Sequence, residues 1–560
     1  MSDEKTNSFE EIMNRCKGAF SNDYTKSFAM PTNFMSLGPM FYQGMFNYNE
    51  QFKSLMQAAF DAFMQTQKEK GLQVSNPDDP NVTKDYINLL KYNMKLSTES
   101  TNSAMAASSE YFCKKMRETA NAWTNTILQN GQENITDFTK RQHKILEKML
   151  VEYPKAIKEI KSEYGFHFEN GGYELISETE HFFLYKIQPT EKDVKINENG
   201  KPILFIHPYV LGPNILAFLP GERKSAVHSF ANMGIPTYIR IEKDIAITSA
   251  VQTMTGEDDI TDTAKFCEII FKKHKVKATL FGICQGGFFA ILAAASGKVD
   301  KYVDAVITCV TPIDGTKSKG LSEFLDETPS GFKNLEYATK TLSNGNKVVD
   351  GKIMALIFKL KSIENESPIV NFYKDLAMFD RPDGKEVEIS KTAAAINHWL
   401  LYDRVDVPIE ITKISFAAYN TPITNDGTLP ITLFGKQLSL KHIEDAGIKV
   451  QACYAESDDL VEKESSTSIA KYINAELTPF PKGHVAIATS WSNPDTEYAY
   501  HKRFGDKQQY RGPVRFHLDL EEEIFKHTPI QNKAVAPQKA KVIQTSKAKR
   551  TKSTNSPKKN

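Results

Sequence analysis

The pattern of hydrophobic and polar positions changes character near residue 170. Before that point, apolar residues recur at steps of three and four, as they do along one face of an amphipathic helix. A stretch with the same period runs from Trp123 to Met149, and glycine and proline are sparse after Pro80. The pattern predicts a helical N-terminal domain over residues 1–165. Its first apolar stripe comprises Phe41, Met45, Phe46, Phe52, Met56, Phe60, Phe63 and Met64.

Beyond residue 170, short apolar runs alternate with helical stretches, which is typical of a mostly parallel sheet flanked by helices. The predicted strands are His181–Ile187, Ile203–Ile206, Thr237–Ile241, Val276–Phe281, Val303–Val310, Ile448–Ala455 and Leu477–Phe480. The predicted helices are Arg223–Met233, Thr261–Lys273, Gly287–Ser296 and Ser465–Asn474. Residues from about 316 to 410 break this rhythm and predict a mostly helical insertion. The pattern therefore favours an α/β domain over residues 166–530.

Composition narrows the class of protein. The 560 residues are 40% hydrophobic and 25% charged, as in ordinary globular chains. No apolar run approaches the ~18–20 residues that a transmembrane helix needs, and Met1 to Lys5 do not begin a secretory signal. The six cysteines are scattered and form no C-x-x-C pair, so we expect reduced thiols and a cytoplasmic location. They are Cys16, Cys113, Cys267, Cys284, Cys309 and Cys453.

The net charge of +1 hides an uneven distribution. Residues 531–560 contain nine basic residues and no acidic one, which leaves about −8 on residues 1–530. A basic tail on an acidic body is not typical of a nucleic-acid-binding fold. We predict that this tail is disordered and solvated. Attraction of the tail to an anionic surface is the less favoured interpretation.

One motif could carry nucleophilic chemistry. The predicted strand Val276–Phe281 is followed by Gly282-Ile-Cys284-Gln-Gly286-Gly287 and then by a helix of small residues. In α/β-hydrolases the nucleophile occupies such a strand-to-helix turn, where flanking glycines relieve steric crowding. The start of the helix also favours a thiolate. We predict that Cys284 is the nucleophile, although a packing turn with an incidental cysteine would give the same letters.

The acid and the base of such a site follow the nucleophile in chain order. An acidic turn, Glu456 to Asp459, comes directly after a predicted strand, and His484 comes in a tight turn after the next one. Catalytic groups collect at the carboxyl ends of parallel strands. The bland alternative for His484 is a solvent-exposed turn histidine. The three signals together, in this order, indicate a catalytic triad.

A backbone oxyanion hole completes the predicted site. The N–H of Gln285, at the start of the helix, would be one donor. The other would come from the loop after Ile203–Ile206, where Pro208 has no N–H and Tyr209 or Val210 must supply it; we expect Val210. His207 in the same loop is interpreted as an architectural residue. No His, Cys and Asp cluster has zinc spacing, so we predict neither a metal nor a cofactor.

At these residues the chain resembles the polyhydroxyalkanoate synthases, whose box G-x-C-x-G-G is matched by Gly282 to Gly287. Glutamine after the cysteine is most similar to the class III enzymes, whereas the length of the helical front end is similar to class I. The resemblance extends over about residues 170–500. Further matching segments are Val310-Thr-Pro-Ile-Asp314, Phe358-Lys-Leu360, the stretch from Trp399 to Pro408, Tyr454-Ala-Glu-Ser-Asp458 and Gly483-His484.

The resemblance selects Asp458 as the acid of a Cys284–Asp458–His484 triad. It departs where Asp459 replaces the histidine that the family has after its aspartate. His207-Pro208 and Leu211-Gly212 also replace Pro-Pro and Asn-Lys of the family's substrate loop. The tryptophan that the family places beside the strands neighbouring its box is not obvious in this chain. These differences affect the expected substrate range and rate.

The resemblance implies an acyltransferase that polymerises (R)-3-hydroxyacyl-CoA into polyester and releases CoA. It also implies association with polyester granules, and either a homodimer or a synthase partner subunit, without nucleic acid. The helical front end would serve assembly or granule association, and the insertion would form a lid. Two alternatives stay open: a thiol hydrolase or polyester depolymerase of the same fold, and a granule scaffold protein with a decayed site.

Overall fold

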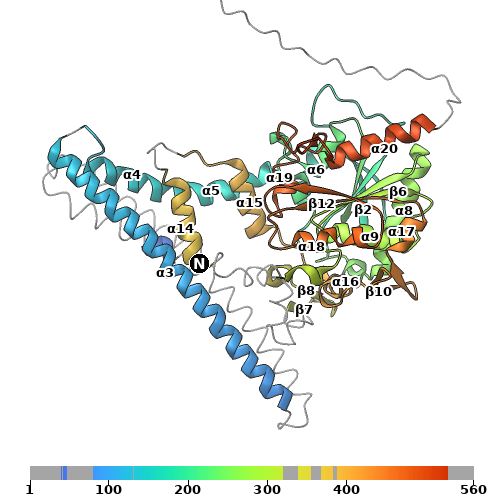
Figure 1. Ribbon diagram of the computed structural model, residues 1–560, viewed down its shortest axis with the longest axis horizontal. Helices are drawn as coiled ribbons and strands as arrows, with labels where there is room; N and C mark the ends of the chain where they lie inside the picture. Colours follow the sequence, from blue (N-terminus) through green and yellow to red (C-terminus); the bar gives the residue numbers. More distant parts are fainter. Residues whose placement is uncertain are drawn as a thin grey trace, which may run out of the picture.

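The computed structural model describes residues 40, 42–46, 80–129, 131–319, 338–354, 367–381 and 387–527. Most of the predicted Met and Phe stripe and the whole basic tail lie outside these described residues. Parts of the predicted insertion, residues 320–337, 355–366 and 382–386, lie outside them as well. Figure 1 shows the described helices of the front end leading into a sheet domain.

Among the described residues, eight strands form one sheet in the order β1-β2-β4-β3-β5-β6-β12-β13. β2 pairs antiparallel with β1 and β4, and the other neighbours run parallel. This order, with an antiparallel second strand, is that of the α/β-hydrolase fold, so the predicted fold class is confirmed. The strands are β1 (Tyr173–Glu178), β2 (Phe182–Ile187), β3 (Ile203–Ile206), β4 (Thr237–Glu242), β5 (Ala278–Ile283), β6 (Val303–Cys309), β12 (Lys449–Ala455) and β13 (Ala475–Phe480).

The central strands are buried on both faces. In β3, Leu204 and Ile206 belong to one hydrophobic cluster, whereas Ile203 and Phe205 belong to another. Successive residues of a strand point to opposite faces, so the two clusters are the two sides of the sheet. Strands buried in this way are continuous apolar runs in the sequence, which explains why both ends of β3 were predicted correctly.

Helices cover both faces of the sheet (Figure 1). α8, α9 and α17 contribute to one cluster, and α6, α19 and α20 to the other. α9 is apolar around its whole circumference because it is buried from Gly286 to Ala295. The helices of this domain are α6 (Ala226–Ala231), α7 (Ser249–Gln252), α8 (Gly256–His274), α9 (Gln285–Ala295), α16 (Ile409–Asn420), α17 (Lys441–Asp445), α18 (Lys463–Ser466), α19 (Ala486–Thr489) and α20 (Pro513–His527).

Several sequence predictions need correction. The predicted strand list omits β1, a half-exposed edge strand in which Glu174 and Glu178 interrupt the apolar pattern. The predicted helix Arg223–Met233 is only α6, because Arg223 adopts φ 58° and Ser225 caps the helix after it. The predicted helix Ser465–Asn474 is the short α18 followed by a 3-10 turn. Small strand pairs also went unpredicted: β7 (Thr339–Thr341) and β8 (Lys347–Val349) with β9 (Val407–Pro408), β10 (Thr428–Leu433) with β11 (Lys436–Ser439), and β14 (Arg503–Phe504) with β15 (Tyr510–Arg511).

The described front end consists of helices, as its periodicity predicted. α3 (Pro80–Leu128) is a long helix that packs against α4 and α14 (Figure 1). α4 (Ile135–Glu147) begins where the side chain of Asn134 accepts the N–H of Asp137. A π-helical segment, Lys148–Glu152, then leads into α5 (Tyr153–Glu159). The predicted helical stretch from Trp123 to Met149 is therefore broken between α3 and α4.

The insertion does not form one compact lid in its described parts. Its helices α14 (Pro368–Phe379) and α15 (Lys391–Tyr402) pack against α3 and α5, respectively. The β7–β8 hairpin instead pairs with β9 and contacts α16. The described parts of the insertion are mostly helical, and this hairpin is a strand pair that the sequence pattern did not predict. The insertion divides between the front end and the α16 side of the sheet domain.

A buried aspartate joins the front end to the insertion. Asp380 directly follows α14, and its side chain is 2% exposed. It accepts hydrogen bonds from Lys114 and Lys115 of α3, each at 2.7 Å, and from Arg141 of α4 at 2.8 Å. Burial raises the pKa of Asp380, but the hydrogen bonds from the two lysines outweigh it, so the net pKa is lowered. We call this group the Asp380 clamp.

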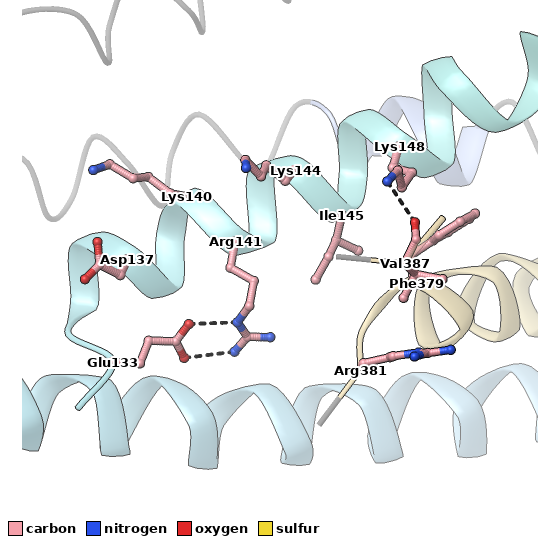
Figure 2. A pocket seen from close by; sticks show the side chains of 10 residues that line it. All are labelled: Glu133, Asp137, Lys140, Arg141, Lys144, Ile145, Lys148, Phe379, Arg381 and Val387. Atoms are coloured by element: carbon pink, nitrogen blue, oxygen red, sulfur yellow. Dashed lines mark hydrogen bonds and ion pairs between the residues drawn. The ribbon is translucent and has the colours of Figure 1, made fainter. Parts of the chain in front are cut away.

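A hollow of about 330 Å³ lies between α4 and the end of α14. Figure 2 shows Arg141 turned toward Glu133, and Lys148 bonded to the carbonyl oxygen of Val387. None of the residues that line it belongs to the predicted triad.

Among the described residues, no helix has both the length and the apolar character required to cross a bilayer.

Candidate active site

The turn after β5 holds Cys284 at φ 52° and ψ −125°, as the residue that precedes α9. This conformation is unfavourable for a residue with a side chain and persists only where the surroundings enforce it. The flanking glycines make the turn possible. A Cβ atom on Gly282 would collide with the backbone of Gly286 and Gly287, and one on Gly286 would collide with Ile206 and His207. The sequence G-x-C-x-G-G thus forms a tight strand-to-helix elbow with Cys284 at its apex.

Asp458 lies just beyond the carboxyl end of β12, and its side chain is fully buried. One carboxylate oxygen accepts the N–H groups of Leu460 and Val461, at 3.0 and 2.9 Å. The other oxygen lies 2.7 Å from Nδ1 of His484. Asp459, the next residue in the same turn, is exposed. The structure therefore brings Asp458, and not Asp459, to the histidine.

His484 follows β13 in a turn that is tied to the turn of Asp458. The N–H of Glu456 donates to Phe480 at 2.8 Å, and the N–H of Ser457 donates to Lys482 at 3.0 Å. Because backbone bonds hold the two turns together, the imidazole and the carboxylate are positioned before any substrate arrives. The histidine side chain is 9% exposed, so the bland interpretation of an exposed turn histidine is wrong.

The electrostatics favour a charged histidine. Burial lowers the pKa of His484, but the negative charges of Asp458 and of a Cys284 thiolate raise it well above its usual value. Its Nε2 atom is buried and has no hydrogen-bond partner among the described residues. A ring with one nitrogen fixed by a carboxylate and the other free near a thiol can transfer protons at that thiol.

Sequence reasoning missed Tyr419, which comes from α16 and packs against Gly315. Burial raises the pKa of Tyr419 well above its usual value, and the charges of Cys284 and Asp458 raise it further. Tyr419 therefore lies close to the triad. No sequence signal marked it, because α16 belongs to a stretch whose position over the sheet could not be read from its own pattern.

The N–H of Val210, a predicted oxyanion donor, is hydrogen-bonded to the side chain of Gln285. The side-chain oxygen Oε1 of Gln285 accepts the N–H of Tyr209 at 3.0 Å and the N–H of Val210 at 3.3 Å. The side-chain nitrogen Nε2 of Gln285 donates to Oγ of Ser415 in α16, at 2.8 Å. The predicted donor Val210 thus lies beside the Cys284 elbow, and its N–H is engaged by Gln285.

A buried ionic group holds the loop after β3 in place. The hydroxyl of Tyr209 bonds to Asp259 of α8, which also pairs with Arg240 of β4 at 2.6 Å. The side chains of Arg240 and Asp259 are each 1% exposed. His207 is buried as well, and burial lowers its pKa to about 4, so it is a neutral ring that accepts the N–H of Glu242. These contacts fit the architectural role expected of His207.

Within the described part of the chain, no group of three or more His, Cys, Asp or Glu side chains could hold a metal ion. The described cysteines are free thiols: Cys113, Cys267, Cys284, Cys309 and Cys453. Cys284 is partly exposed, whereas Cys267, Cys309 and Cys453 are buried. Cys284 is thus the partly exposed thiol at the strand ends where Asp458 and His484 meet.

No family model and no curated protein matches the chain. Its fold is similar to that of a carboxylesterase from the thaumarchaeon Nitrososphaera gargenis, with 17% identity, a TM-score of 0.33, and coverage of 56% of this chain and 92% of the other. It is similar to monoglyceride lipase from Saccharomyces cerevisiae, with 12% identity, a TM-score of 0.37, and coverage of 66% and 99%. It is also similar to a thioesterase domain from the curacin biosynthetic pathway, with 11% identity, a TM-score of 0.30, and coverage of 57% of this chain and 95% of the other.

Proposed function

We propose that this chain is a polyhydroxyalkanoate synthase, an acyltransferase that joins (R)-3-hydroxyacyl groups from CoA thioesters into a polyester. The observation that carries the proposal is a cysteine, rather than a serine, at the elbow of an α/β-hydrolase fold, with a buried Asp458–His484 pair beside it. The resemblance of Gly282 to Gly287 to the synthase box supplies the substrate class.

A cysteine suits this reaction for an energetic reason. Attack of the Cys284 thiolate on a hydroxyacyl-CoA forms one thioester and breaks another, and CoA leaves with the proton held by His484. The acyl group therefore stays activated. In the next step His484 takes the proton of a hydroxyl group on a second hydroxyacyl unit or on the growing chain. That oxygen attacks the acyl-cysteine, an oxoester forms, and the Cys284 thiolate is released.

The other residues act on charge and geometry. Asp458 fixes the tautomer of His484 and stabilises its cation. The N–H of Gln285 and that of Val210 would stabilise the oxyanion that develops on the thioester carbonyl. The α16 helix and the β7–β8 hairpin would limit access of water to the acyl-cysteine, which otherwise hydrolyses.

The remaining parts of the proposal concern the location and the partners of the enzyme. The front end would mediate assembly, as a homodimer or with a synthase partner subunit, and association with polyester granules in the cytoplasm. The exposed apolar side chains of α3 suit an apolar partner. They are Met94, Met105, Phe112, Met116, Ile127 and Leu128.

One experiment tests the proposal against its closest alternative. Purified protein is mixed with 3-hydroxybutyryl-CoA, while CoA release and polymer turbidity are followed together. A synthase releases CoA as turbidity rises. A thiol hydrolase would release CoA and free hydroxy acid without turbidity, and a scaffold protein with a decayed site would release neither. Either of these last two results would refute the proposed function.

A further inference from the structure

The side chain of Gln285 makes three hydrogen bonds that connect separate parts of the site. Its Oε1 atom accepts the N–H groups of Tyr209 and Val210, from the loop after β3. Its Nε2 atom donates to Ser415 of α16, whose hydroxyl in turn bonds to the carbonyl oxygen of Ile411. An uncharged carbonyl oxygen thus lies where two adjacent N–H groups converge.

Two converging N–H groups beside a nucleophile elbow are the arrangement that binds a developing oxyanion. One of them, the N–H of Val210, is the donor expected to stabilise the reacting carbonyl. We infer that the amide of Gln285 is a latch: when no acyl group is present, its oxygen occupies the N–H of Val210, a proposed oxyanion donor, together with the adjacent N–H of Tyr209, and its nitrogen ties this closed state to α16. The inference rests on the proposed acyl transfer at Cys284.

The surroundings decide which part must move. The loop after β3 is held in place by the core, because Tyr209 bonds to Asp259, which is paired with the buried Arg240. The backbone of Gln285 is fixed as the first residue of α9. The side chain of Gln285 is therefore the mobile part. If it rotates away from Val210, its bond to Ser415 is lost as well, so the opening of the oxyanion hole and the release of α16 are one event.

The chemistry of the incoming group provides the driving force. A neutral substrate carbonyl offers no stronger acceptor than the amide that it would replace. An oxyanion forms charge-assisted hydrogen bonds, which are roughly twice as strong as neutral ones. The latch therefore opens as negative charge develops on the acyl group. This makes Gln285 a positioning residue through its side chain, in addition to the role proposed for its backbone N–H.

The test compares two substitutions of similar size with opposite effects on the latch. In Gln285→Glu the carboxylate binds the same N–H groups more strongly than the amide does, and in Gln285→Met no strong acceptor remains. The readout is the burst of p-nitrophenol from p-nitrophenyl butyrate, which reports acylation of Cys284. We expect the burst rate to fall at least tenfold in Gln285→Glu at pH 8 and to rise at least twofold in Gln285→Met. Ser415→Ala, which removes the tie between Gln285 and α16 together with the bond from Ser415 to Ile411, should also give a faster burst.

Alkylation of Cys284 by iodoacetamide is the control, because that displacement forms no oxyanion. Its rate should stay within threefold of wild type in Gln285→Met and Ser415→Ala. In Gln285→Glu the new carboxylate lies beside the thiol and disfavours its thiolate, so there the burst should slow at least tenfold more than alkylation does. The opposite ranking, with a normal burst rate in Gln285→Glu and a slow burst in Gln285→Met, would show that Gln285 only supports the loop and would overturn the inference. An equal loss of burst rate in both variants would overturn it as well. A parallel loss of alkylation would also overturn it. Wild-type protein that shows the ester burst but does not polymerise 3-hydroxybutyryl-CoA would refute the proposed function alone.

Discussion

Two aspartates of this chain are equally buried and yet do different things. Asp458, after β12, and Asp380, after α14, have side chains that are 0% and 2% exposed. Asp380 is surrounded by three permanent cations, from two lysines and an arginine. Asp458 is surrounded by two backbone N–H groups and one histidine. Burial and charge alone therefore do not mark a catalytic carboxylate.

The difference lies in the partner. The Asp380 clamp joins a carboxylate to two lysines and an arginine, so it connects helices and contains no histidine that could pass a proton. His484 is a side chain that can pass a proton, and its second nitrogen is free beside Cys284. We expect a buried aspartate to serve a reactive site when its partner can titrate and has a second atom near a candidate nucleophile.

The largest expected effect is that of removing the nucleophile. Cys284→Ala should abolish CoA release while the fold is kept, because a smaller side chain fits an elbow enclosed by Gly282 and Gly286. Steady-state kinetics and a thermal melt provide the two measurements. Cys453→Ala is the matched control, since that thiol is buried in β12 and is not part of the proposed triad, and its turnover should be close to wild type. Activity of Cys284→Ala within tenfold of wild type would disprove the mechanism.

The comparison of the two aspartates becomes sharpest in three matched variants. Asp458→Asn should lower kcat by about 10³- to 10⁴-fold, because His484 loses the group that orients it and stabilises its cation. Asp380→Asn and Asp459→Asn should each keep kcat within about threefold, a size typical of residues outside the reacting group. Initial rates of CoA release would distinguish them. A similar loss of kcat in Asp380→Asn and Asp458→Asn would show that the two aspartates do not differ in their importance for the reaction.

The two carboxylates should also give opposite pH dependence of stability. The raised pKa of folded His484 means that its pairing with Asp458 stabilises the protein fully below the unfolded value of about 6.5. This contribution is lost as the pH rises through the folded pKa. The difference in melting temperature between wild type and Asp458→Asn should therefore be largest near pH 6 and shrink at alkaline pH. A difference that grows with pH would contradict the assigned charge state.

The Asp380 clamp should act on local stability. Asp380→Asn should loosen α14 from α3 by about 1–2 kcal/mol, a value reduced for the partial exposure of Lys114 and Arg141. Because the folded pKa of Asp380 is lowered, the contribution is present above the unfolded value of about 3.9 and is lost as the pH falls through the folded value. Hydrogen exchange should rise in α14 and α3 while β5 stays protected. Unchanged protection of α14 would show that the clamp contributes nothing.

The smallest effect is expected on the surface of α3. Cys113 is an exposed thiol, and Cys113→Ala should leave kcat and the melting temperature within experimental error, since it removes no buried contact. It also provides a protein in which thiol reagents have one fewer exposed target. A marked loss of activity in this variant would indicate that α3 contributes to the reaction.

The sequence was sufficient for features that are local. The elbow was legible because Gly282 and Gly286 stand at fixed positions around Cys284, although the collision that requires glycine at position 286 is with Ile206 and His207. The order of Cys284, Asp458 and His484 was legible because each follows a buried strand, and buried strands are apolar runs. These predictions needed no knowledge of how distant segments pack. The choice between Asp458 and Asp459 already depended on a family resemblance.

Features made by contacts between distant segments could not be predicted in this way. The bond from Gln285 to Ser415 joins residues 130 positions apart, and that from Lys114 to Asp380 joins residues 266 positions apart. Neither pair has a sequence pattern of its own. The edge strand β1 escaped because half of its residues face outward, and the divided insertion escaped because α14 and α15 pack on the front end.

The unfavourable backbone angles of Cys284 have a consequence for biosynthesis. Such a conformation costs on the order of 1–3 kcal/mol and is maintained only when β5, β3 and α9 are assembled around it. His484 lies 200 residues further along the chain and is translated long after the thiol. In a nascent or misfolded chain, Cys284 therefore has neither these backbone angles nor His484 beside it. Chemical competence of the thiol thus reports that synthesis and assembly of this domain are complete.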